Sequence, residues 1–237
     1  MTRPTGTLIV LQARMGSRRL PGKALSRIGD RSVLAHCLAR LRAGGVAPVM
    51  VATTTEPEDD AIVAEAAACG VESFRGSRDD VLDRFVRLAR LAGAARVVRA
   101  TADNPAVDID APARVLAGLE ASGADHVVDE GLPCGAAVEA VMVPALEAAL
   151  ASSHDAYDHE HVTPFVIRES ARFRAVRLPA PAAVRRPDLR FTVDTREDLI
   201  YMRDVFAVAG ASASVAPLAA LIAAADRARA LTWLGAA

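Results

Sequence analysis

The sequence predicts an α/β protein in which a mostly parallel sheet is covered by helices. Short apolar runs alternate along the chain with segments whose apolar residues recur at helical spacing, which is the pattern of such a sheet. The chain has 237 residues, of which 52% are hydrophobic, so it can bury one large core. Because no low-complexity linker divides it, we expect residues 1–237 to form a single domain.

Composition argues against several classes of function. A formal net charge of −1 disfavours a broad surface for nucleic acid or membrane. The first apolar run is too short for a signal peptide, and charged residues interrupt the apolar segment 216–234, so we expect no membrane span. The three cysteines are odd in number and lack metal-ligand spacing, which favours a reduced, cytoplasmic protein.

Start and stop signals delimit most elements. Ser32 can cap a helix that ends at Gly44, Pro57 opens another with an acidic first turn, and Asp110 can cap a third. We expect strands over residues 8–11, 49–52, 71–74, 96–100, 127–128 and 138–143, and helices over 33–43, 57–69, 81–92, 111–121, 196–209 and 216–234. The proline-rich residues 179–187 are expected to be an extended connector between strands.

The most informative stretch is the loop after the first predicted strand, where residues 12–23 read Q-A-R-M-G-S-R-R-L-P-G-K. Open α/β sheets bind ligands in loops just past the carboxyl ends of their strands. Arg14, Arg19 and Lys23 place positive charge in this loop. These features predict a cradle for a polyphosphate.

Two glycines support that prediction without completing a standard motif. Gly16 and Gly22 allow the backbone to turn its N–H groups toward an anion. They are one residue too far apart for a Walker A loop, and Ala24 stands where that motif has a hydroxyl. A solvated basic loop is the alternative that charge by itself leaves open.

Two aspartates are candidate metal ligands. Asp103 directly follows a predicted strand, in T-A-D-N-P, and Asp194 ends the apolar run L-R-F-T-V-D-T, which we expect to be the last core strand. Since parallel strands end at one edge, both carboxylates are expected to reach one cation, and without metal their repulsion should keep one from ionising. Thr195 and Asp198 are spaced as a capping box for the next helix.

Other motifs leave alternatives open. The D-x-D string of Asp108 and Asp110 is of the sort that metal-dependent glycosyltransferases use, although Asp110 more simply caps a helix. His159 and His161 are two residues apart and do not face one another, so a zinc site is not expected. A structural or surface role is expected for His159.

Four separated stretches together resemble the CTP-dependent sugar-acid cytidylyltransferases. They are the opening Q-A-R-M-G-S-x-R-L-P-G-K, then R-x-T-A-D-N-P, H-E-H-V-T-P-F and L-x-x-T-V-D-T. The pattern is similar to the spore-coat polysaccharide type and more distantly to CMP-KDO synthetase and acylneuraminate cytidylyltransferase. The resemblance covers about residues 7–206.

The resemblance implies a three-layer α/β/α sandwich with a mixed, mostly parallel sheet, the nucleotide-diphospho-sugar transferase (GT-A-like) fold. It implies transfer of CMP from CTP to an anionic acceptor with release of pyrophosphate, with Mg²⁺ held by Asp103 and Asp194. It leaves a homodimer open. The implied catalytic residues are Arg14, Arg19 and Lys23; the nucleotide-binding residues Gln12, Ala13, Arg14, Gly16, Ser17, Lys23, Asp80, Arg84 and Thr101; and the acceptor-binding residues Arg99, Glu139 and His161.

One departure from the family pattern concerns the acceptor. Relatives carry P-x-G-x-D-V-E where residues 133–139 read P-C-G-A-A-V-E, so Ala137 replaces an aspartate while Glu139 is retained. The acceptor therefore stays open between a sugar acid, a sugar phosphate and a phosphonate. A nucleotide-binding module without catalysis is a second alternative.

Overall fold

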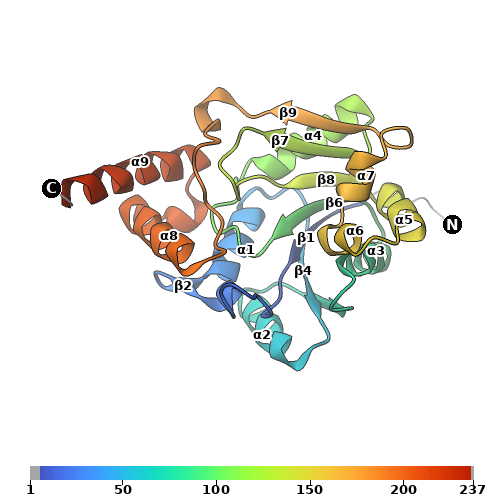
Figure 1. The fold of residues 1–237 in the computed structure, drawn as a ribbon, viewed down its shortest axis with the longest axis horizontal. Helices are drawn as coiled ribbons and strands as arrows, with labels where there is room; N and C mark the ends of the chain where they lie inside the picture. The colour runs from blue at the N-terminus through green and yellow to red at the C-terminus, as the bar shows by residue number, and fades with distance from the viewer. Residues whose placement is uncertain (1–5, 236–237) are drawn as a thin grey trace.

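A seven-stranded sheet forms the middle layer of the protein (Figure 1). The computed structural model describes residues 6–235, with side chains as far as residue 230. The strand order is β5 (Ser73–Gly76), β4 (Val49–Thr54), β1 (Gly6–Gln12), β6 (Ala94–Thr101), β8 (Glu139–Met142), β7 (His126–Glu130) and β9 (Ala175–Pro179). The first four strands are parallel, β8 is antiparallel to both neighbours, and β7 pairs in parallel with β9.

Alternation along β1 divides the core into two halves. Leu8 and Val10 pack on one face of the sheet, and Ile9 and Leu11 pack on the other, because successive side chains of a strand point to opposite faces. The first face is covered by α3 (Val81–Leu91), α5 (Val143–Ser152), α6 (Ala156–His161) and α7 (Pro164–Arg168). The second is covered by α1 (Val33–Ala43), α2 (Asp60–Ala68), α4 (Ala111–Ser122), α8 (Arg196–Ala209) and α9 (Leu218–Gly235). The predicted three layers are confirmed.

Short elements complete the chain. The strands β2 (Arg27–Ile28) and β3 (Arg31–Ser32) form a separate ribbon, and 3₁₀ turns occupy η1 (Lys23–Leu25), η2 (Pro57–Asp59), η3 (Ala182–Val184) and η4 (Ala213–Val215). Figure 1 shows α8 and α9 side by side at the C-terminal end of the fold. No helix within residues 6–235 has the length and hydropathy needed to cross a bilayer.

Side-chain hydrogen bonds form at two of the predicted helix caps, Ser32 and Thr195, but not at Asp110. Ser32 Oγ accepts a hydrogen bond from the Ala35 N–H (3.0 Å), and Thr195 and Asp198 form the predicted capping box of α8. Asp110 is the N-cap residue of α4, as predicted, but its side chain makes no capping hydrogen bond. Its own N–H donates instead to the carboxylate of Asp108 (3.3 Å).

Two strand predictions are corrected. The third strand covers Ser73–Gly76 rather than residues 71–74, because the Val71 N–H still donates to Ala66 at the end of α2. Residues 189–194 are extended but do not form a strand of the sheet. The Phe191 N–H donates to the Cys134 carbonyl and the Val193 N–H to the Asp103 carbonyl, both at 2.7 Å. The segment therefore pairs with two different loops and not with a neighbouring strand of the sheet. Strand β9 was not foreseen, and its last residue and η3 occupy part of the expected connector 179–187.

Gly135 lies in the loop between β7 and β8 and allows residues 189–194 to pass close to that loop. Its φ is +90°, and a Cβ atom there would lie 2.7 Å from the Thr192 backbone nitrogen and 2.9 Å from Asn104 Oδ1. The backbone strain and the clash coincide at this residue. The path of the chain from Thr192 to Asp194 therefore depends on a glycine at position 135.

Gly135→Ala is expected to lower the free energy of unfolding by about 2 kcal/mol, because alanine adds strain and a clash with backbone. Urea denaturation measures the loss. Gly45→Ala is the matched control, since Gly45 also has positive φ (+61°) but no neighbouring atom within 4 Å of the added Cβ. Equal losses in the two variants would show that the contact with Thr192 imposes no constraint.

Candidate active site

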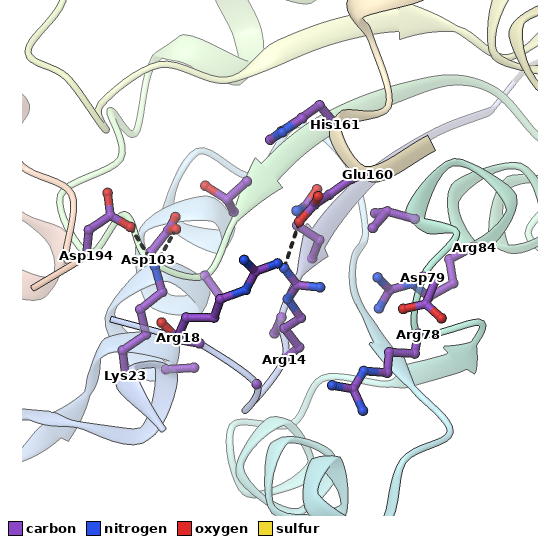
Figure 2. A pocket seen from close by; sticks show the side chains of 18 of the residues that line it. Arg14, Arg18, Lys23, Arg78, Asp79, Arg84, Asp103, Glu160, His161 and Asp194 are labelled. Atoms are coloured by element: carbon purple, nitrogen blue, oxygen red, sulfur yellow. Dashed lines mark hydrogen bonds and ion pairs between the residues drawn. The ribbon is translucent and has the colours of Figure 1, made fainter. Parts of the chain in front are cut away.

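A cavity of about 660 Å³ opens where β1 and β6 end (Figure 2). The loop after β1, the end of β6, the start of α3 and the helix α6 contribute its walls. Thirteen of the predicted site residues line it: Gln12, Ala13, Arg14, Gly16, Ser17, Arg19, Lys23, Arg84, Arg99, Thr101, Asp103, His161 and Asp194. The predicted residues Asp80 and Glu139 do not line this cavity.

The buried carboxylate of Asp59 holds the basic loop in place. Asp59 accepts a hydrogen bond from the Met15 N–H (2.7 Å), and the Met15 carbonyl accepts from the N–H groups of Ser17 (2.8 Å) and Gly22 (3.1 Å). Gly22 has φ 70°, which turns the chain into η1. The N–H of Gly22 is thus used within the loop, and this glycine serves the turn that brings Lys23 to the cavity.

Lys23 joins the two predicted metal ligands. Its Nζ lies 2.8 Å from Asp103 Oδ2 and 2.9 Å from Asp194 Oδ1, as Figure 2 shows. The two carboxylates are brought together as expected, but by a different route. Asp103 follows β6, whereas Asp194 lies at the end of the extended segment that Asp103's own carbonyl helps to hold.

Asp194 is surrounded by cations. Besides Lys23, it accepts from Arg190 (2.7 Å) and pairs with Arg19 (3.1 Å). Burial by itself would raise the pKa of Asp194, but Lys23, Arg19 and Arg190 outweigh it and the pKa is lowered. The expectation that repulsion between the carboxylates opposes ionisation is therefore wrong for Asp194, because the protein supplies the neutralising charge itself.

The donor set fits a divalent ion that brings other ligands with it. Among the described residues, no group of three or more His, Cys, Asp or Glu side chains gathers in a metal-binding arrangement. Mg²⁺ is usually held by one or two carboxylates together with waters and substrate phosphates. Asp103 and Asp194 match that requirement, whereas a dedicated protein cage would need more ligands.

Arg84 is a buried cation that forms no ion pair with another residue of the described part of the chain. It lies in α3, is 2% exposed, and its Nε and Nη1 atoms have no hydrogen-bond partner among the described residues. Burial, and secondarily the nearby charge of Arg14, lower the pKa of Arg84 to about 10. An unpaired buried charge is unfavourable, and Arg84 lines the cavity, so an anion bound there would offset this cost.

Arg99 is held by residues behind the cavity wall. Its Nη1 donates to Glu139 Oε1 (3.1 Å), and Glu139 Oε2 lies 3.2 Å from the buried ring nitrogen of His126. Burial opposes ionisation of Glu139, but Arg99 and His126 prevail and lower its pKa to about 2. Glu139 therefore orients Arg99 from behind, while Arg99 itself reaches the cavity.

Helix α6 is tied to α3 and presents one histidine to the cavity. Asp80 caps α3 by accepting from the Asp83 N–H and pairs with His159 Nδ1, both at 2.8 Å. His159 also contacts the Ser153 carbonyl (3.0 Å), so its expected structural role is confirmed. A turn with positive φ at Val162 (75°), closed by a hydrogen bond from Thr163 to the His161 carbonyl, follows His161.

Several cavity residues were not identified from the sequence: Arg18, Ala24, Arg78, Asp79, Val81, Ala102, Ala156 and Glu160. Arg78 and Asp79 stand in the polar turn before α3, where charge was visible but indistinguishable from a solvated turn. Glu160 pairs with Arg14 (2.9 Å; Figure 2) and so links α6 to the basic loop. That contact joins residues far apart in sequence, and no local pattern announces it.

The D-x-D string does not contribute to the cavity. Asp108 is 2% exposed and pairs with Arg114 (2.7 Å), which also pairs with Asp129 (2.6 Å). These three side chains connect α4 to β7 and hold the loop before α4. Neither Asp108 nor Asp110 lines the cavity, so the sequence basis for a glycosyltransferase disappears.

A family model described as cytidylyltransferase matches residues 8–221, which is most of the chain. The chain belongs to the cytidylyltransferase family. It is therefore a nucleotidyltransferase, and the predicted enzyme class is confirmed.

Relatives agree with this assignment. The cytidylyltransferase is 32% identical over 211 residues to the spore coat polysaccharide biosynthesis protein SpsF of Bacillus subtilis, covering 86% of this chain and 87% of SpsF. It is 36% identical over 190 residues to an uncharacterised protein of Methanocaldococcus jannaschii, covering 80% and 78% of the two chains.

Solved structures confirm the fold. A cytidylyltransferase from Leptospira borgpetersenii superposes with a TM-score of 0.86 at 26% identity, covering 97% of this chain and 96% of the other. A CMP-2-keto-3-deoxy-manno-octonic acid synthetase in complex with CTP has a TM-score of 0.64 at 19% identity, with 86% and 99% covered. A Mycobacterium tuberculosis protein in complex with manganese has a TM-score of 0.57 at 19% identity, with 83% and 96% covered.

Asp194→Asn is expected to lower the free energy of unfolding by about 1 kcal/mol at neutral pH, because three cations lose an ionised partner. The lowered pKa of Asp194 means that this stabilisation is present above the usual value of 3.8 and disappears as pH falls through the folded-state pKa. Urea denaturation of both proteins across this range checks it. Asp204→Asn, at an exposed position of α8, serves as the control, and a pH-independent difference would contradict the prediction.

Arg84→Met is expected to raise the stability of the unliganded protein by about 1 kcal/mol, since it removes an unpaired buried charge and keeps the aliphatic stem. Denaturation without ligand measures the gain. Arg87→Met is the matched control, because Arg87 lies in the same helix but is exposed and pairs with Asp83 (3.6 Å). A clear loss of stability in Arg84→Met would assign this arginine to the scaffold instead.

Proposed function

We propose that this cytidylyltransferase transfers CMP from CTP to an anionic acceptor and releases pyrophosphate. The observation that carries the proposal is the cavity in which the basic loop after β1 faces the carboxylates of Asp103 and Asp194. A triphosphate needs concentrated positive charge, and phosphoryl chemistry depends more on positioning and charge neutralisation than on covalent catalysis.

The proposed roles follow from position in the cavity. Arg14, Arg19 and Lys23 hold the triphosphate and stabilise the leaving pyrophosphate, as preorganised donors do for developing charge. Asp103 and Asp194 would hold Mg²⁺, which neutralises phosphate charge when bound. The remaining contacts proposed for the nucleotide come from Gln12, Ala13, Gly16, Ser17, Arg84 and Thr101.

The acceptor is proposed to bind beside Arg99 and His161. Both line the cavity, and both can donate hydrogen bonds to a carboxylate, phosphate or phosphonate group. A sugar acid is the acceptor class that the related synthetase and the spore-coat relative suggest. Glu139 supports Arg99 in this scheme, and Asp80 supports α6; neither is proposed to contact ligand.

Ala137 does not argue for a catalytically silent module. It is partly buried, packs against the core, and is not among the residues that line the cavity. Replacing aspartate by alanine there leaves the predicted catalytic set in place. Cytoplasmic location, a homodimer and a single domain remain predictions.

The proposal is tested first by calorimetry with each of the four nucleoside triphosphates and Mg²⁺, because this needs no acceptor. CTP is expected to bind most tightly, and at about a hundredfold excess over its dissociation constant it should stabilise the fold by about 2.7 kcal/mol. Pyrophosphate release is then measured with CTP, Mg²⁺ and sugar-acid, sugar-phosphate and phosphonate acceptors. Asp103→Asn should lose most of this activity while Asp204→Asn keeps it. Transfer from UDP-glucose, with none from CTP, would overturn the proposal.

A further inference from the structure

Lys23 is chemically unique in this protein. It is the only lysine of the 237-residue sequence, which contains 27 arginines. Its side chain is 15% exposed, and the ammonium group lies between the two carboxylates that would hold the metal. The only lysine thus lies in the wall of the cavity, beside Asp103 and Asp194 toward the left of Figure 2.

An ammonium group suits that position better than a guanidinium. Lysine ends in a compact point charge on a flexible four-carbon stem, whereas the planar fork of arginine binds one carboxylate through two parallel contacts. Nζ of Lys23 makes one short contact to each of two carboxylates, Asp103 Oδ2 and Asp194 Oδ1. The stem also lets the charge move without displacing the backbone of η1.

The same geometry obstructs a metal ion. A divalent cation would use these carboxylate oxygens as ligands, and it would be repelled by an ammonium already bonded to them. The described residues add no third acidic or histidine ligand that could compensate. Without phosphate, therefore, the protein offers a metal ion two carboxylates that already pair with Lys23, and Asp194 pairs with Arg19 and Arg190 as well.

A triphosphate changes this balance. Its negative charge gives the ammonium a second set of acceptors within the cavity and gives a metal ion the oxygen ligands that the protein lacks. Movement of Lys23 onto the phosphates would free Asp103 and Asp194 at the moment when a metal ion can bridge both partners. A divalent ion would then take the place of the monovalent ammonium, and the negative charge of the triphosphate would compensate the additional positive charge.

We propose that Lys23 is an exchangeable internal cation, which occupies the position between Asp103 and Asp194 until a nucleoside triphosphate draws it away. Divalent metal and triphosphate then bind as a coupled pair, each strengthening the affinity of the other by the same factor. The inference rests on the proposed function and adds to it the order in which metal and nucleotide bind. Metal does not precede nucleotide, and the carboxylates are never left uncompensated.

The first experiment measures Mn²⁺ binding by calorimetry, without nucleotide, to the wild type, Lys23→Met and Arg19→Met. Arg19 is the matched control, because it also carries one charge near Asp194 (3.1 Å) but contacts only that carboxylate and is exposed. Removing either charge weakens repulsion, whereas only Lys23→Met vacates the position between the two carboxylates. Lys23→Met is expected to strengthen Mn²⁺ binding by about tenfold more than Arg19→Met does, within the usual range of such couplings.

The same titrations are repeated with saturating CTP. In the wild type, CTP should strengthen Mn²⁺ binding by about tenfold to a hundredfold, and Lys23→Met should reduce that factor because nothing remains to be displaced. Equal effects of Lys23→Met and Arg19→Met on Mn²⁺ affinity would overturn the inference. So would an undiminished effect of CTP in Lys23→Met.

The second experiment uses the unsubstituted protein and does not depend on the folding of a variant. Selective ¹³C,¹⁵N-lysine labelling gives a single lysine side-chain signal in the NMR spectrum, because the sequence holds one lysine. The signal should stay in place when Mg²⁺ is added without nucleotide and should shift when CTP and Mg²⁺ are added together. An equal shift with Mg²⁺ and no nucleotide, or no shift when calorimetry shows CTP bound, would overturn the inference. Absence of CTP binding would instead overturn the proposed function.

Discussion

The ion pairs of Lys23 with Asp103 and Asp194 are the interaction on which the site depends. They connect residues separated by 80 and 171 positions in the chain. Three segments meet there: the basic loop after β1, the end of β6, and the extended segment before α8. Because the ammonium, together with Arg19 and Arg190 at Asp194, offsets the charge of the two carboxylates, these segments can converge without metal.

The buried charges of the site are treated in two different ways. Arg99 has Glu139 as counter-ion, with His126 behind it, so its position is set before any ligand arrives. Arg84 is buried and forms no ion pair within the described residues, so we expect it to lower the stability of the unliganded protein. The first arrangement fixes the orientation of Arg99. The second leaves the guanidinium of Arg84 with hydrogen-bond donors that have no partner among the described residues. Both arrangements suit the polyanion binding proposed for this site.

The site is supported by residues that do not themselves line the cavity. Asp59 fastens the basic loop through Met15, and Gly135 lets the segment before Asp194 pass against the neighbouring loop. Asp80 and His159 fasten α6 to the start of α3. Asp80, which the resemblance assigned to nucleotide binding, does not line the cavity and instead pairs with His159. The polar side chains of a loop are shared between holding the loop and facing the ligand.

The sequence by itself determined the class of fold, most elements and most of the cavity. Alternating apolar runs predict the layers because burial follows a period of two in strands and 3.6 in helices, and caps such as Ser32 and Thr195 act within one turn. Tertiary structure decided the rest. It decided whether residues 189–194 pair in a ladder, whether the Asp110 side chain bonds to α4, and whether Glu139 lines the cavity. Tertiary structure also placed Lys23 between Asp103 and Asp194, because local sequence patterns identify each charged residue but not the residue with which it pairs.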